Sequence, residues 1–322
     1  MTRLRDDLDD LAALSARAGE HFGIPEAFVE KDYWVTELLR SVAKPSDDAI
    51  AIFKGGTSLS KAYGLIERFS EDVDILLLVT REESKGFGKG SIDKILKRIC
   101  ARAGRDLDIP PERQKTFGKT GVRRDVRYVY DAQVMSGALK EGVLLEMGCR
   151  GGPTPRASRE IRSIISGFAR VSGIADETEF EELAPFEIDV LAPERTLIEK
   201  LALLHRLASS FPESETDLTR AGRHLYDIHQ ILGDGGVVAV MSRGSSLAAE
   251  LAADADEHSR RWNLAFVPRP EGGFADSPAF DLGHPCTRSL RAGYEAARDL
   301  IYGPVPTFTE CIESVRSAAD LL

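Results

Sequence analysis

The fold of this chain is decided by the stretch FKGGTSLS at residues 53–60, which is followed by RFSEDVDI at residues 68–75. A short apolar run, 50–53, ends at the glycine pair, and apolar residues at helical spacing follow over 58–66. Strand, glycine turn and helix are therefore predicted in this order. The second string opens an apolar run, 73–79, that is short and branched enough to be a buried strand.

The glycine pair offers a place for a phosphate chain. Gly55 and Gly56 carry no side chain, so backbone N–H groups at the start of the helix can approach a phosphate closely. The hydroxyls of Thr57 and Ser58 would add two further donors. Glycine pairs after strands are also common in ordinary turns, so this pattern by itself leaves a purely structural turn open.

Two aspartates stand at the entrance to the second predicted strand. Asp72 and Asp74 are two residues apart, and residues i and i+2 of a strand point to the same face. Like charges side by side are costly unless a cation lies between them, and oxygen ligands suit a Mg²⁺ ion that also contacts substrate phosphates. The apolar run that follows disfavours the alternative of two solvated aspartates at a polar strand end.

Glu146 is the third candidate carboxylate. It lies in VLLEM, residues 143–147, an otherwise apolar predicted strand in which an unpaired charge would be expensive. A metal ion would satisfy it, and three acids form the pattern expected for two-metal phosphoryl chemistry. Pairing with a nearby arginine is an equally good alternative.

These residues together resemble a known family. The glycine pair, Thr-Ser-Leu and then Arg-x-Ser-x-Asp-x-Asp are similar to the signature of the AbiEii/AbiGii-type nucleotidyltransferase toxins, which include the MenT-like toxins. The resemblance extends to EKDYWV at 30–35, EKLALLHR at 199–206, RHLYDI at 223–228 and the closing segment 294–321. It implies a DNA polymerase β-like nucleotidyltransferase fold, a nucleoside triphosphate as donor and Mg²⁺ as the working ion.

The resemblance also assigns later functional positions to Lys200 and Asp227. A lysine on a helix that faces the cleft could balance triphosphate charge as a compact point charge. An exposed helix lysine beside Glu199 is the alternative. Asp227 could orient the lysine, bind the base or sugar, or take a proton, and the sequence does not choose among these roles.

Arg68 and Ser70 fall on the same signature, and the resemblance implies that they contact the triphosphate. For Arg68 the alternative is an ordinary surface ion pair with Glu67 or Glu71, its neighbours in the sequence. Both residues are retained as candidates for nucleotide binding.

Three histidines invite a metal-site interpretation. His224 and His229 flank Asp227 on a predicted helix, but they are five positions apart, whereas ligands on one helical face are three or four apart. His205 stands alone on another segment. Structural histidines with satisfied hydrogen bonds are therefore expected.

The composition is that of an ordinary folded protein. A chain of 322 residues can bury a substantial core in one large or two modest domains. Its 43% hydrophobic and 29% charged residues exclude disordered and fibrous classes. The N-terminus lacks an apolar signal core and no stretch approaches the length of a membrane span, so a cytoplasmic location is expected. The four cysteines show no C-x-x-C spacing and are expected to be free thiols.

The apolar pattern changes near residue 190. Earlier segments show both helical and strand periodicity of their apolar residues. Helices are expected at 24–42 and 92–103, a glycine-rich loop at 85–91 and strands at 126–134 and 142–147. Later segments are mainly helical, apart from a Pro/Gly-rich piece at 267–285. The pattern predicts an α/β or α+β layer in 1–190 and a mainly helical domain in 191–322. The resemblance implies the α+β alternative, with a mixed-sheet nucleotidyltransferase core and N-terminal helices in 1–190.

The charge balance limits the partners. A net charge of −10 and a pI near 5.3 argue against indiscriminate nucleic-acid binding, although a basic stretch at 94–127 could hold RNA or be a solvated face. The resemblance implies a tRNA 3′ end as acceptor and a cognate antitoxin as partner. A protein acceptor and a non-catalytic nucleotide-binding module are the competing functions. The three carboxylates argue against the module.

Overall fold

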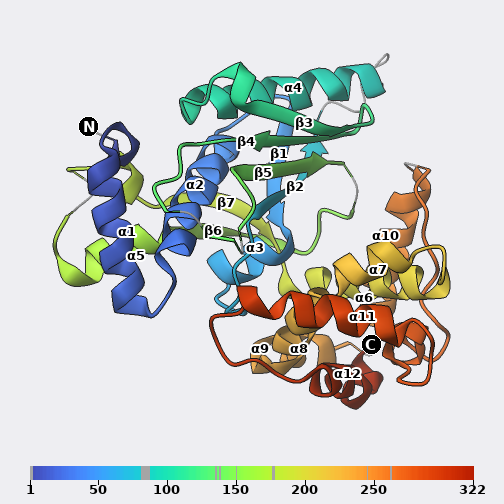
Figure 1. Ribbon diagram of the computed structural model, residues 1–322. Coiled ribbons are helices and arrows are strands. Elements are labelled where there is room, and N and C mark those ends of the chain that lie inside the picture. The colour runs from blue at the N-terminus through green and yellow to red at the C-terminus, as the bar shows by residue number, and fades with distance from the viewer. Residues whose placement is uncertain are drawn as a thin grey trace. The chain divides into compact units, whose positions relative to one another are not determined.

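The computed structural model describes residues 3–80, 88–134, 136–137, 139–149, 151–175, 178–244, 246–261 and 263–322 (Figure 1). The chain forms two compact units. The sheet unit comprises Met1–Ala62, Phe69–Cys149 and Arg156–Val190, and the helical unit comprises Tyr63–Arg68, Arg150–Pro155 and Leu191–Leu322. Within the described residues, no helix is long and apolar enough to cross a bilayer.

The sheet unit is built on a seven-stranded sheet in the order β3-β4-β5-β2-β1-β7-β6. The central strand β2 runs antiparallel to β1 and parallel to β5, and β1 runs parallel to β7, so the sheet is mixed. This arrangement confirms the predicted α+β class. The strands are β1 (Ala49–Lys54), β2 (Asp72–Val79), β3 (Gln114–Lys119), β4 (Arg123–Tyr128), β5 (Val143–Gly148), β6 (Arg156–Ile161) and β7 (Phe186–Leu191).

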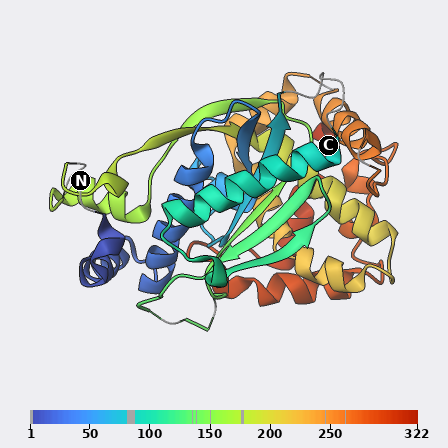
Figure 2. The same ribbon diagram turned by 90° about the horizontal axis from the view of Figure 1, so that it is seen from above.

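Helices α2 (Glu26–Ala43) and α4 (Lys89–Asp106) pack together on one face of this sheet. Figure 2 looks down on α4, which lies over the strands. Arg124 of β4 bonds Asp93 of α4, so the side chain of the next residue, Asp125, points to the opposite face. The sheet therefore has one face covered by α2 and α4 and a second face that carries the acids described below.

Several boundaries differ from the sequence-based expectation. Helix α3 (Gly55–Lys61) begins at the glycine pair itself, directly after β1, and ends five residues earlier than the expected 66. Of the expected loop 85–91, residues 85–87 lie outside the described part of the chain, and Lys89–Ser91 belong to the first turn of α4. Strands β3, β6 and β7 were not predicted, and the residues of β3 and β6 are mostly exposed and polar.

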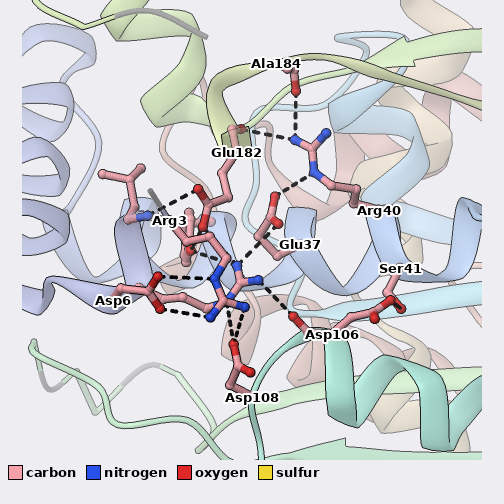
Figure 3. Close-up of polar contacts among 12 residues, drawn as sticks. Arg3, Asp6, Glu37, Arg40, Ser41, Asp106, Asp108, Glu182 and Ala184 are labelled. Atoms are coloured by element: carbon pink, nitrogen blue, oxygen red, sulfur yellow. Dashed lines mark hydrogen bonds and ion pairs between the residues drawn. The ribbon is translucent and has the colours of Figure 1, made fainter. Parts of the chain in front are cut away.

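An ion network fixes the N-terminus of the sheet unit, and Figure 3 shows Glu37 and Glu182 at its centre. Arg5 lies just before α1 (Leu8–Phe22) and is largely buried. Its guanidinium pairs with Glu182 at 2.9 Å and Glu37 at 3.5 Å, and it donates to the hydroxyl of Tyr33 at 3.2 Å. Because Tyr33 and Glu37 are one turn apart, these contacts hold the N-terminal segment on α2.

The helical unit has α6 at its centre, in contact with α7, α8, α9 and α10. The predicted stripe of Leu197, Leu201 and Leu204 is fully buried. The segment 267–285 is irregular as expected, apart from two short 3-10 turns. The helices are α6 (Pro193–Ser209), α7 (Glu215–Ala221), α8 (His224–Gly233), α9 (Gly235–Ser242), α10 (Leu247–Arg261), α11 (Thr287–Ala296) and α12 (Phe308–Ser317).

Candidate active site

Position 55 requires a glycine because an aspartate side chain approaches it closely. Its φ of +79° lies in the left-handed region that disfavours side chains. A Cβ atom at this position would lie 2.9 Å from Cγ of Asp74 and closer still to its Oδ2. The glycine motif therefore leaves room for the Asp74 carboxylate at the junction of β1 and α3, a reason that the sequence pattern did not reveal.

The hydroxyls next to the glycine pair bond within the protein. Thr57 Oγ1 donates to the carbonyl oxygen of Asp72, and Ser58 Oγ donates to that of Gly55 at 2.9 Å. Both side chains are buried, as is Gly56. Thr57 thus ties α3 to the first residue of β2. Both hydroxyls therefore already donate inside the protein, Thr57 to the start of β2 and Ser58 within α3, and their expected contact with a phosphate stays a prediction.

Four carboxylates share one face of the sheet. Asp74 of β2 pairs in register with Glu146 of β5, and Glu146 pairs with Asp125 of β4, so the three side chains lie side by side on neighbouring strands. Asp72 points to the same face two residues before Asp74. We call Asp72, Asp74, Glu146 and Asp125 the acidic row.

Asp125 was missed by the sequence analysis. The strand was expected to begin at Val126, and the aspartate stands among arginines in RRDVRY, so it was counted only as part of a basic stretch. The alternation of Arg123, Asp125 and Arg127 on one face was the available signal. A carboxylate next to Glu146 follows only when the register of β4 on β5 is known.

The surroundings of Glu146 in the acidic row shift its pKa. Burial, and then the negative charge of Asp74, raises the pKa of Glu146 to about 7. Arg123 acts in the opposite direction: its guanidinium lies 2.8 Å from Asp125 and 3.5 Å from Glu146. The arginine pairing considered for Glu146 is therefore present, and the partner is Arg123.

The donor chemistry of the acidic row fits a magnesium ion completed by substrate. Within the described ranges, no group of three or more His, Cys, Asp or Glu side chains forms a ready metal cage. Magnesium does not need one, because it keeps several waters and binds through one or two carboxylates plus substrate phosphates. Asp72 and Asp74 offer such a pair of carboxylates, and a cation beside them would offset the charge of Asp74, which after burial is the second cause of the raised pKa of Glu146.

Helix α2 contacts both the glycine-led helix α3 and the segment that leads into β2 through two adjacent charged side chains. Buried Lys31 pairs with Glu71, the residue before Asp72, at 3.1 Å. Asp32 pairs with Lys61 at the end of α3 at 2.5 Å. The helix therefore holds the start of β2 and the end of α3 at once, which gives the segment EKDYWV a role that the sequence did not indicate.

The helical unit contains a buried ion cluster of Arg68, Lys200, His224 and Asp227. The Arg68 guanidinium forms two parallel hydrogen bonds to the Asp227 carboxylate, at 2.6 and 2.7 Å. Lys200 Nζ lies 2.8 Å from the same carboxylate. Arg68 is 2% exposed and Lys200 6% exposed, so the surface alternatives considered for both residues are wrong.

The cluster sets the ionisation of its members. Burial opposes the charged form of Asp227, but the charges of Arg68 and Lys200 outweigh it and hold the pKa of this carboxyl well below its usual range. Burial lowers the pKa of Lys200 despite the attraction of Asp227. Burial and the charge of Lys200 lower the pKa of His224 to about 3, so this imidazole is neutral and its Nδ1 accepts from Lys200 Nζ at 3.1 Å. The contact of Asp227 with Lys200 is the one that the first of its three expected roles, orienting the lysine, would need.

The remaining candidates have structural surroundings. His205 contacts Ser277 Oγ and the carbonyl oxygen of Pro268, and His229 contacts Ser314 Oγ, as expected for structural histidines. The backbone oxygen of Ser70 lies 3.4 Å from Thr57 Oγ1, a long contact. The four cysteines are free, as predicted, and all four are buried.

A mixed sheet that carries aspartates beside a glycine-led helix, with a buried lysine in a helical unit, defines the class of this protein as a nucleotidyltransferase. The chain belongs to the AbiEii family, described as nucleotidyl transferase toxins of type IV toxin–antitoxin systems, whose profile matches residues 37–313. This confirms the resemblance and the enzymatic class. The protein is thus a toxin nucleotidyltransferase.

Solved structures are also similar to this chain. MenT4, a nucleotidyltransferase toxin from Mycobacterium tuberculosis H37Rv, is 16% identical with a TM-score of 0.38, and 95% of this chain and 97% of that chain are covered. JHP933 from Helicobacter pylori is 17% identical with a TM-score of 0.30, covering 88% and 93% of the two chains. No curated protein sequence matches.

Proposed function

We propose that this protein transfers a nucleoside monophosphate from a nucleoside triphosphate to the 3′ end of a tRNA in a magnesium-dependent reaction. The acidic row carries the proposal. Asp74 and Glu146 lie in register on adjacent parallel strands, and Asp72 shares their face. Such a concentration of carboxylates is costly unless it serves to hold a cation.

Each site residue has a proposed role. Asp72 and Asp74 would hold Mg²⁺, with Glu146 as a third carboxylate beside Asp74. The ion would supply charge neutralisation at the triphosphate and activation of the attacking hydroxyl. Gly55 leaves room for the Asp74 carboxylate, and Thr57 bonds the backbone of Asp72 at the start of β2. Gly56 and Ser58 are proposed to lie against the triphosphate as part of the same glycine-led segment.

In the helical unit, Lys200 would stabilise phosphate charge. Its ammonium is held by Asp227 and by the neutral His224. Arg68 forks onto Asp227 and so supports this lysine. Ser70, between Arg68 and Asp72 in the sequence, is proposed only as part of the nucleotide-binding segment.

RNA is the proposed acceptor, and a cognate antitoxin is the proposed protein partner. The family's place in toxin–antitoxin systems supports the second proposal. The RNA proposal has weaker support, because many cations of the stretch 94–127 are paired with carboxylates, including Lys97, Arg98, Arg113, Arg123 and Arg124. Transfer to a protein is therefore retained as an outcome of the test below.

The test is a transfer assay with total RNA, each labelled nucleoside triphosphate in turn, and Mg²⁺ or EDTA. We expect label on tRNA only with Mg²⁺, and none with Asp74→Asn. The matched control is Asp131→Asn, which removes the same charge from an exposed aspartate in the sheet unit. Label on protein alone would reject the RNA acceptor, and full activity of Asp74→Asn would reject the site.

A further inference from the structure

Arg123 bridges two carboxylates of the acidic row. It begins β4 and stands two residues before Asp125, so both side chains lie on the same face of the sheet. Its Nε donates to Asp125 at 2.8 Å, and its Nη2 lies 3.5 Å from Glu146. One guanidinium therefore contacts the acids of two neighbouring strands, β4 and β5.

The geometry of the two contacts is unequal. The bond to Asp125 is within hydrogen-bonding distance, whereas the contact with Glu146 is a looser ion pair. The Arg123 side chain is 53% exposed and that of Asp125 is 10% exposed. The arginine can therefore swing toward solvent, away from Glu146, while Asp125 continues to hold it.

Asp125 has room reserved for it. A Cβ at Gly118, its partner on β3, would lie 3.1 Å from Cγ of Asp125 and closer to its Oδ2. The pairing of β3 with β4 also shifts register between Thr116 and Gly118. The edge strand thus leaves space for this carboxylate in the same way that Gly55 leaves space for Asp74.

We propose that Arg123 is a built-in counter-ion that pairs with Glu146 in the metal-free protein and releases it when a divalent cation binds, while Asp125 keeps the arginine in place. Arg123 and Asp125 are then positioning residues of the reaction. The inference rests on the proposed function, since it requires the acidic row to bind a metal. No bond is made or broken in this exchange; a fixed cation is replaced by a soluble one.

The exchange predicts that the effect of Arg123 on metal affinity depends mainly on Glu146. A nearby positive charge weakens cation binding wherever it stands, so a single substitution does not distinguish competition from a general field. A double-mutant cycle does, because it isolates the term that requires both partners.

The experiment titrates the full-length, metal-depleted protein with Mn²⁺ and measures free Mn²⁺ by electron paramagnetic resonance. The variants are Arg123→Gln, Glu146→Gln and the double variant, each checked for folding by circular dichroism. We expect Arg123→Gln to tighten Mn²⁺ binding about tenfold in the wild-type background, a shift typical for the loss of a charge at this distance. In the Glu146→Gln background the same change should alter affinity less than about twofold.

A control variant matches the charge change. Arg124→Gln removes an arginine from the next position of β4, on the face that meets α4, and should leave Mn²⁺ affinity within about twofold. An equal tightening by Arg123→Gln in both backgrounds, or none in either, would overturn the counter-ion while leaving the metal site intact. Absence of Mn²⁺ binding by the wild-type protein would overturn both this inference and the proposed function.

Discussion

A comparison of Gly55→Ala with Gly64→Ala measures how much stability is lost when a side chain at position 55 meets Asp74. Both have positive φ, +79° and +63°, but a Cβ at Gly64 meets nothing within 4 Å. Gly64→Ala should cost about 1–2 kcal/mol from the backbone conformation alone. Gly55→Ala should cost at least twice as much and reduce transfer strongly, because the Asp74 carboxylate has to move.

Urea denaturation and the transfer assay on both variants give the comparison. Asp74→Ala added to Gly55→Ala should recover part of the lost stability, since the obstructing carboxylate is then gone. Equal costs for the two glycine substitutions would mean that the carboxylate does not determine this glycine.

His224 gives the helical unit a defined response to acid. Its pKa is lowered from 6.5 to about 3, so the unfolded chain takes up a proton below pH 6.5 while the native protein does not. The stability associated with the neutral imidazole is complete above pH 6.5 and is lost as pH falls toward 3. His224→Gln should reduce the acid-induced loss in the free energy of unfolding by up to about 3 kcal/mol at pH 4. Urea denaturation between pH 7 and 4 measures it.

The control for this measurement is His21→Gln, which replaces an exposed histidine of α1. Its stability curve should parallel that of the wild-type protein. A decline in His224→Gln as steep as that of the wild type would show that other groups cause the acid sensitivity.

At the residue scale, the sequence indicated the acids that stand in one motif and missed those brought together by register. Asp72 and Asp74 share a strand, so their common face follows from local geometry. Asp125 and Arg123 meet Glu146 across a strand pair whose register no local pattern determines. The partner of Arg68 is Asp227, 159 positions away, and only the family resemblance drew attention to both.

At the element scale, α2 acts as a support for two motifs at once. Lys31 and Glu71 form a buried pair, and removing one partner of such a pair typically costs about 3–5 kcal/mol because the other charge is left buried. Lys31→Met should therefore destabilise the protein strongly. Because Glu71 directly precedes Asp72, the substitution Lys31→Met should also reduce nucleotidyl transfer.

A double-mutant cycle with Glu71→Met separates the pair from its surroundings. We expect a coupling energy of at least about 2 kcal/mol in urea denaturation, against about 0–1 kcal/mol for the exposed pair Lys115 and Glu141. Similar coupling in both pairs would place Lys31 and Glu71 among ordinary surface ion pairs.

The element boundaries that the sequence predicted well are those with strong periodicity. The helix expected at 24–42 is α2, and the strand expected at 73–79 is β2. Strands β3 and β6 escaped prediction because edge strands expose both faces and lack apolar alternation. Helix α3 starts earlier than expected because Gly55 and Gly56 enter the helix instead of forming a separate turn.

At the scale of the whole molecule, the proposed binding of RNA would have to compete with the protein's own acids. Arg98 on α4 pairs with Asp48 at 2.5 Å, so the arginine is partly neutralised before any phosphate arrives. Asp48→Asn should strengthen tRNA binding and steepen the dependence of log affinity on log salt by about 0.9, the value for one added duplex contact. Filter binding between 50 and 200 mM salt measures both quantities.

Asp217→Asn is the control for net charge, since it removes an exposed acid from the helical unit. The same gain in both variants would show that total charge matters and that the stretch 94–127 has no special part in RNA binding. The overall charge of −10 gave only this general expectation from the sequence. Which cations are neutralised depends on contacts between distant segments.

The course of the chain between the units limits how its gene can be divided. Tyr63–Arg68 belongs to the helical unit although it lies between α3 and β2 in the sequence, and Arg68 bonds Asp227. A fragment that ends at residue 190 would keep this arginine and lose its carboxylate. Recombination at that point would likewise join an arginine from one parent to an aspartate from another. The six residues Tyr63–Arg68 therefore prevent the two units from being inherited as independent modules.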